Sequence, residues 1–311
     1  MKWILCLLLV AMLGVLAFWG FRAQQVFTRQ LQEFVPTPYD ASTKGRALLV
    51  RARRVAREVE WTLADGTRQI AWFIPPRNGA VILYAHGSPG QGLSFLDGEA
   101  QPLVDRGYGA LLIDLPGYGL SEGNRAWDDR FIESFRRGID FALAQQGVDP
   151  TRIGAFGYSN GACLVARVAA QDERLSALVL LASYTRLSDQ LHHTYQRRTP
   201  GLGWVAIAAS LHAGVPVSEL DTLAALERMA ARPTLIIWGG RDTAIPDFMG
   251  PILQSAVHQA EGVQYDDVGH LGYFATLGTQ YAENLDRFYT RALGIKTANP
   301  PAEPAKAILE P

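Results

Sequence analysis

The sequence predicts an α/β fold, with a mostly parallel sheet and helices on both of its faces, and two observations carry this prediction. First, short apolar segments alternate with stretches of helical periodicity from about residue 80 to 293, the pattern of repeated strand–helix–strand units. Second, these short segments are apolar along nearly their whole length, as strands buried on both faces should be. The 311 residues, 48% hydrophobic and 19% charged, suffice for a large globular core.

The chain begins with an uncharged apolar run over residues 3–21, framed by Lys2 and Arg22. A run of about 20 such residues is what a helix needs to cross the hydrocarbon core of a membrane. We therefore expect a transmembrane anchor at residues 1–22. A cleaved signal peptide is the alternative, because Val15 and Ala17 provide small residues at cleavage-site spacing.

Between the anchor and the main domain, residues 23–56 are polar and rich in arginine, and we expect them to form a tether with some helix. Residues 57–63 and 68–75 then alternate apolar and polar side chains around Asp65-Gly66. This pattern predicts an N-terminal β-hairpin with a type I′ turn at Asp65-Gly66.

The main domain is expected over residues 57–294. Its strands after the hairpin are expected at residues 80–85, 110–115, 153–158, 175–182 and 234–238. Its helices are expected at residues 95–105, 128–146, 161–171 and 279–293. Residues 184–232 break the alternation and are expected to be a short helical lid insertion. The Pro/Ala-rich tail, residues 295–311, is expected to be disordered.

The composition argues against several classes of partner. A formal net charge of −1 and scattered arginines argue against a nucleic acid as partner. Cys6 and Cys163 lie far apart in the sequence, and no Cys/His cluster suggests a metal. The adjacent His192 and His193 are expected to be surface residues.

One motif raises the question of chemistry. GYSNG at residues 157–161 follows an apolar strand segment and opens a helical one. A serine between two glycines at such a junction matches the nucleophile elbow, in which the serine sits in a strained turn and its neighbours must lack a Cβ. Ser159 is therefore the candidate nucleophile.

A serine hydroxyl is a weak nucleophile and requires a base, which a carboxylate must orient. In this architecture the acid and then the histidine follow the serine, each just beyond a strand. Asp242 follows the strand segment TLIIW, and His270 follows the strand-like VQYDDV. Each alone has an ordinary structural explanation, but their order and positions together favour a Ser159–Asp242–His270 triad. The backbone N–H groups of Ser88 and Asn160 are expected to form the oxyanion hole.

With these residues in view, the sequence resembles the serine hydrolases of the α/β-hydrolase superfamily. It matches H-G-x-x-G at residues 86–90 and D-x-x-G-x-G-x-S at residues 114–121, in addition to the elbow, the acid turn and the G-H of the base. The resemblance covers residues 59–293 and implies the α/β-hydrolase fold. Within the superfamily, the sequence most resembles membrane-anchored members with short lids, some of which act on lipid esters or acyl thioesters.

The resemblance implies hydrolysis of a carboxylic ester through an acyl-enzyme on Ser159, with no metal or organic cofactor. The serine at the elbow argues against dehalogenases and epoxide hydrolases, which carry aspartate there. Two alternatives stay open: a peptidase similar to proline iminopeptidases, and a catalytically inactive domain that serves as a binding module.

The substrate is expected to contact Tyr158, beside the serine, and Trp204, in the apolar run 202–211 of the insertion. That run either packs on the sheet or overhangs Ser159 and faces the bilayer. The small-molecule or lipid ester would be met at a bacterial inner membrane, with the catalytic domain on the periplasmic side. Charges flank both ends of the apolar run and do not decide its orientation.

Overall fold

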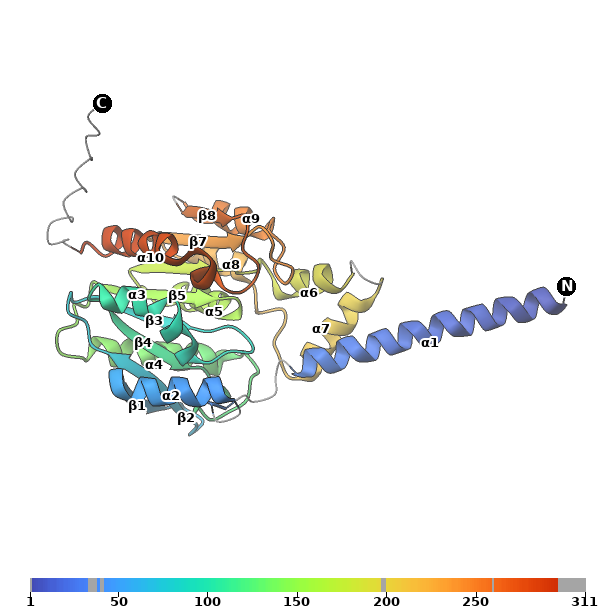
Figure 1. Cartoon of the computed structure of the whole chain (residues 1–311), viewed down its shortest axis with the longest axis horizontal. Helices are drawn as coiled ribbons and strands as arrows, with labels where there is room; N and C mark the ends of the chain where they lie inside the picture. Colours follow the sequence, from blue (N-terminus) through green and yellow to red (C-terminus); the bar gives the residue numbers. More distant parts are fainter. Residues whose placement is uncertain (1, 33–37, 40–41, 197–199, 259, 296–311) are drawn as a thin grey trace, which may run out of the picture.

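A computed structural model of the chain describes residues 2–32, 38–39, 42–196, 200–258 and 260–295 (Figure 1). Its core is an eight-stranded sheet in the order β1-β2-β4-β3-β5-β6-β7-β8. The hairpin strands β1 and β2 pair antiparallel, β2 pairs antiparallel with β4, and all the other pairs are parallel. The expected fold class and N-terminal hairpin are confirmed. The strands are β1 (Arg57–Thr62), β2 (Arg68–Ile74), β3 (Val81–Ala85), β4 (Gly109–Asp114), β5 (Ile153–Tyr158), β6 (Ala177–Leu181), β7 (Thr234–Gly239) and β8 (Glu261–Tyr265).

Two apolar cores lie on the two faces of this sheet. Alternate residues of β3 divide between them, with Val81, Leu83 and Ala85 in one core and Ile82 and Tyr84 in the other. The first core is covered by α4 (Asp129–Leu143), α5 (Asn160–Ala169), α8 (Thr222–Arg228) and α9 (Met249–Ser255). The second is covered by α2 (Thr43–Val55), the 3-10 helix η2 (Gly92–Asp97), α3 (Ala100–Asp105) and α10 (Tyr273–Ala292). Every residue of β3, β4, β6 and β7 is buried, which explains their unbroken apolar character.

The hairpin turn differs from its expected type. A type I′ turn needs a positive φ at both central residues, but only Gly66 of the pair has one, at +87°. The Leu63 N–H instead pairs with the Thr67 carbonyl oxygen at 3.0 Å, and the Gly66 N–H bonds back to the Leu63 carbonyl oxygen at 2.9 Å. The loop therefore spans three residues, with the glycine in the left-handed position that such loops require.

The segment expected to be a tether belongs in part to the domain. Ser42 caps α2 through its hydroxyl, which accepts from the Gly45 N–H at 2.9 Å. Leu48 and Ala52 of α2 and the preceding Tyr39 are buried in the second core. The expectation of a simple tether at residues 23–56 is wrong for these residues, because a polar and arginine-rich helix still carries one apolar face.

The insertion between β6 and β7 is helical, with α6 (Leu187–Gln196), α7 (Leu202–His212) and α8. α7 packs against α6 and against the long N-terminal helix α1 (Lys2–Gln32), at the edge of the domain (Figure 1). The Trp19 indole N–H donates to the Pro200 carbonyl oxygen at 3.0 Å beside the start of α7. Helix α7 thus rests on α1, which neither expectation for residues 202–211 included.

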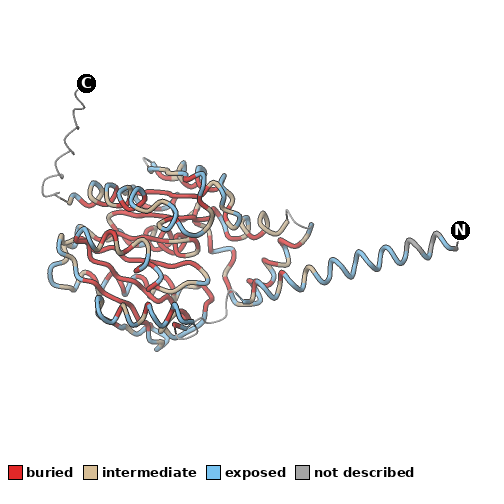
Figure 2. Tube along the Cα trace, viewed as in Figure 1, coloured by how far each residue is buried: buried red, intermediate tan, exposed pale blue. Residues whose placement is uncertain are grey.

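The helix α1 extends far from the rest of the molecule, and its outer part is exposed (Figure 2). It is long and apolar enough to cross a membrane, a property that signal sequences share. Its last turns return to the domain, where Val26 and Gln30 are buried. The tail expected to be disordered lies, from residue 296 on, outside the described residues.

Candidate active site

Ser159 stands at the junction of β5 and α5. Its backbone has φ +55° and ψ −120°, a conformation that costs a side-chain-bearing residue about 1–3 kcal/mol. A Cβ on Gly161 would overlap the Ala85 carbonyl oxygen, and one on Gly157 would come within 2.5 Å of the Ala162 Cα. The two motif glycines are therefore needed so that the turn can fit against β3 and α5. The Ser159 side chain sits at this turn with the residue 7% exposed.

Asp242 and His270 follow β7 and β8, so they lie at the edge of the sheet formed by the carboxyl ends of the parallel strands, where Ser159 follows β5. The His270 Nδ1 lies 2.7 Å from the Asp242 Oδ2, and the aspartate side chain is only 1% exposed. The other carboxylate oxygen accepts from the Ala244 and Ile245 N–H groups, each at 2.8 Å. These contacts fix the carboxylate, and a carboxylate that accepts from Nδ1 leaves Nε2 as the ring nitrogen outside this bond.

Tyr158 lies against His270. Its hydroxyl donates to the His270 carbonyl oxygen at 2.7 Å, and the two rings are 5.2 Å apart. The residue expected to bind substrate is thus engaged in holding the histidine beside the elbow.

No hydrogen bond joins the Ser159 hydroxyl to the His270 ring in the part of the chain that the structure describes. Such contacts are often long in unliganded enzymes and tighten on binding substrate.

The loop after β3 approaches the serine. A Cβ on Gly87 would stand 3.0 Å from the Ser159 Cβ, so this glycine permits the close approach. The next residue, Ser88, accepts on its Oγ a hydrogen bond from the Tyr118 hydroxyl at 2.7 Å. Asn160 opens α5, and the first N–H groups of a helix have no partner within it. Of the expected oxyanion residues, Asn160 directly follows the serine on α5, and Ser88 comes one residue after the glycine that approaches the serine.

His86 ties this loop to the loop after β4. Its Nε2 accepts from the Leu115 N–H at 3.2 Å, and its Nδ1 donates to the Gly87 carbonyl oxygen at 2.8 Å. Both bonds are satisfied only by the neutral ring with its proton on Nδ1. Burial lowers the pKa of His86 to about 4, which keeps the ring neutral near pH 7.

The sequence missed a second link between these loops. Asp114, fully buried, accepts on Oδ1 from the Tyr39 hydroxyl at 2.6 Å and from the Gly92 N–H at 2.9 Å, and on Oδ2 from the Leu120 N–H at 3.1 Å. The Tyr39 hydroxyl in turn accepts from the Leu93 N–H at 3.1 Å. Burial raises the pKa of Asp114 to about 6, against the opposing effect of its hydrogen bonds. The motif signalled Asp114, but nothing near Tyr39 in the sequence marked it as its partner.

Trp204 is not brought to this site. Its side chain points outward, with the residue 66% exposed, and its ring lies 5.4 Å from that of His192. The structure therefore does not support its expected contact with substrate, because α7 rests on α1 at the edge of the domain. As for metals, the described residues contain no group of three His, Cys, Asp or Glu side chains that could hold one.

Comparison with known proteins agrees with this architecture. A family model described as alpha/beta hydrolase fold matches residues 80–208. The uncharacterised protein YfhR of Escherichia coli O157:H7 is 27% identical over 251 residues, covering 76% of this chain and 82% of YfhR. The uncharacterised protein Rv2307c of Mycobacterium tuberculosis is 29% identical over 242 residues, covering 75% and 79%.

Solved structures share the fold. The esterase Pf2001 of Pyrococcus furiosus superposes with a TM-score of 0.64 at 18% identity, covering 77% of this chain and 93% of the esterase. Matches in sequence and in fold thus accompany the eight-stranded sheet, the serine at the strand–helix turn and the acid–histidine pair at the same edge of the sheet. The chain therefore has the α/β-hydrolase fold, and residues 80–208 match the family model described by that name.

Proposed function

We propose that this protein is a serine hydrolase that cleaves carboxylic esters through an acyl-enzyme on Ser159. The observation that carries the proposal is the buried Asp242 carboxylate, held by two backbone N–H groups and bonded to His270 at the same sheet edge as the strained serine. A carboxylate that orients one nitrogen of a histidine leaves the other free to activate a serine.

In the first half of the reaction the His270 Nε2 accepts the Ser159 hydroxyl proton as the Oγ attacks the ester carbonyl carbon. The resulting oxyanion is stabilised by the N–H groups of Ser88 and Asn160 and by the N-terminus of α5. The tetrahedral intermediate collapses with cleavage of the carbon–oxygen ester bond. His270 returns the proton to the departing alcohol, and the acyl group stays on Ser159.

In the second half, water takes the place of the alcohol. His270 accepts a proton from the water as its oxygen attacks the acyl carbon. A second oxyanion forms and collapses, and the proton returns to Ser159 as the carboxylic acid leaves. Asp242 keeps the imidazolium oriented throughout and is not itself protonated. This half-reaction needs no group from outside the chain other than water.

Membrane attachment is part of the proposal. The apolar run of α1 supports it, because its described side chains are exposed and it extends away from the catalytic domain (Figures 1 and 2). The helix would keep the ester-cleaving domain at a bilayer surface. The periplasmic side, expected from the sequence analysis, stays a prediction.

A fluorophosphonate probe tests the hydrolase proposal directly, since it reacts with an activated serine. Labelling of the full-length protein should be lost in Ser159→Ala and in His270→Ala. Ser255→Ala, an exposed serine at the end of α9 whose hydroxyl bonds the Ile252 carbonyl oxygen, should label normally. Absence of labelling in the correctly folded wild type would favour the inactive binding module instead.

A further inference from the structure

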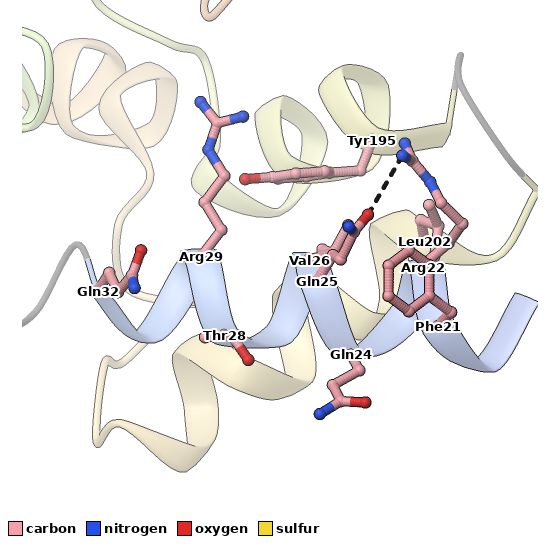
Figure 3. A pocket seen from close by; sticks show the side chains of 10 residues that line it. All are labelled: Phe21, Arg22, Gln24, Gln25, Val26, Thr28, Arg29, Gln32, Tyr195 and Leu202. Carbon is pink, nitrogen blue, oxygen red and sulfur yellow. Dashed lines mark hydrogen bonds between the residues drawn. The ribbon is translucent and has the colours of Figure 1, made fainter.

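A cavity of about 500 Å³ opens where α1 leaves its apolar run (Figure 3). Its walls come from the last turns of α1, from Tyr195 of α6 and from Leu202 of α7. None of the residues proposed for ester hydrolysis lines it. The cavity is therefore separate from the chemistry described so far.

Two arginines face this cavity. The side chains of Arg22 and Arg29, two helical turns apart on α1, rise on either side of the Tyr195 ring (Figure 3). Arg22 donates to the neutral Gln25 Oε1 at 3.3 Å. The described part of the chain pairs neither arginine with a carboxylate and contributes no acidic side chain to the lining. Two such guanidinium groups favour an anion, and phosphate fits their paired donors.

The position of the cavity along α1, relative to the apolar run, indicates the source of that anion. The uncharged run ends at Phe21, so Arg22 is the first charged side chain after it. Since a helix rises 1.5 Å per residue, Arg29 lies about 10 Å beyond Arg22. With the run in the hydrocarbon core, Arg22 lies at the level of the headgroups and Arg29 lies just outside them.

Apolar side chains adjoin the two cations. Phe21, Val26 and Leu202 line the cavity together with the arginines. Trp19, one turn nearer the N-terminus, is 41% exposed, and tryptophan favours the membrane–water boundary. A phosphate with a glyceryl and acyl part would use both kinds of surface, whereas free phosphate would use only the charges.

We propose that this cavity binds the headgroup of an anionic phospholipid from the bilayer that α1 enters. Arg22 and Arg29 would contact its phosphate, and Phe21 and Leu202 would lie beside the start of its acyl chains. Because α1, α6 and α7 all contribute to the cavity, the bound lipid would hold these three helices together. The inference rests on the proposed membrane insertion of α1 and is independent of the proposed ester hydrolysis.

The test uses full-length protein purified in detergent and incubated with equal amounts of dioleoylphosphatidylglycerol and dioleoylphosphatidylcholine. Lipids retained after gel filtration are quantified by mass spectrometry for the wild type, Arg22→Gln, Arg29→Gln and the double variant. Arg53→Gln/Arg54→Gln, in the last turn of α2, is the matched control because it removes the same charge elsewhere.

The wild type should retain phosphatidylglycerol in preference to phosphatidylcholine. Each single variant should lower that preference about fivefold and the double variant about thirtyfold, while the control stays within twofold of the wild type. Equal retention of both lipids by the wild type, or an equal loss in the control, would overturn the proposal.

Two further arms separate the possible outcomes. Displacement of phosphatidylglycerol by millimolar inorganic phosphate would show that the site binds free phosphate. A mature chain that begins at Phe18 would lack the helix that enters the bilayer. Either result contradicts the lipid proposal. Hydrolysis of p-nitrophenyl acetate, measured on the same preparations, should be unchanged in all the variants. Its absence in the wild type would refute the proposed hydrolase and leave the lipid result standing.

Discussion

The edge of the sheet around Ser159 and the pair of helices α1 and α7 are built in opposite ways. At the sheet edge, the buried carboxylates of Asp114 and Asp242 each accept several hydrogen bonds, which join neighbouring loops. At the helix pair, large apolar side chains such as Trp204 and Leu211 face outward. The first region has the preorganised polar contacts that chemistry requires, and the second has the apolar surface that suits a membrane.

The largest expected effect breaks the first region at its centre. Ser159→Ala and His270→Ala should each lower kcat for p-nitrophenyl acetate by about 10⁶, and Asp242→Ala by about 10⁴, because these groups act as a unit. His258→Ala, on the surface, should stay within a few-fold of the wild type. Steady-state kinetics on the folded variants measures this. Full activity in His270→Ala would remove the proposed base.

The second prediction concerns the pH dependence of stability. Because the folded-state pKa of Asp114 is about 6 and that of an unfolded aspartate is about 3.9, the folded state keeps a proton that the unfolded state has lost between these values. Raising the pH through this window therefore lowers the stability of the wild type relative to Asp114→Asn, by about 3 kcal/mol in total.

Unfolding of both proteins between pH 4 and pH 7 measures that difference. The low pKa of His86 acts in the opposite direction in the wild type, but it is common to both proteins and cancels in the comparison. A stability difference that does not change with pH would show that the pKa of Asp114 is not raised by folding, and would contradict the prediction.

A smaller effect is expected where the loops of the sheet edge are joined. Tyr39→Phe removes the hydroxyl that bonds Asp114 and the Leu93 N–H, which should cost about 1–3 kcal/mol of stability. Displacement of the loop after β3 should lower kcat about tenfold with little change in KM.

Tyr108→Phe is the matched control for this variant. Its hydroxyl is bonded to the Thr290 hydroxyl at 2.9 Å, away from the predicted triad. It should lose stability without losing kcat. Equal kcat values in Tyr39→Phe and the wild type would limit Tyr39 to a purely structural role.

The smallest effect is expected in the helix pair. Since Trp204 points away from Ser159, Trp204→Asp should leave the ratio of octanoate to acetate ester hydrolysis within twofold of the wild type. Rates on soluble p-nitrophenyl esters measure this ratio. Loss of a preference for octanoate in this variant would indicate that α7 lies over the site, and would contradict the contrast drawn between the two regions.

The sequence predicted the sheet edge far better than the helix pair. The glycines around Ser159 and the strands before Asp242 and His270 are local signals, and local signals carry from sequence to structure. Tyr39 meets a partner 75 residues away, and the contact of Trp19 on α1 with Pro200 beside α7 spans 181 residues, so no spacing in the sequence indicated either contact.

Even a local signal failed at Asp65-Gly66. The dipeptide predicted a two-residue turn, but the pairing of Leu63 with Thr67 set a longer loop. The register of the strands decided the turn in this case, and the intrinsic preference of the dipeptide did not.

The central claim is that Ser159 carries the acyl group during turnover, and peptide mapping of acid-quenched protein tests it most directly. The full-length wild type is mixed with excess p-nitrophenyl acetate, quenched within the first turnovers, digested and analysed by mass spectrometry. The account predicts an acetyl group on the peptide that contains Ser159, at that residue, and none in Ser159→Ala. Turnover of the ester with no acetyl group on Ser159, or with the same acetylation elsewhere in both proteins, would contradict it.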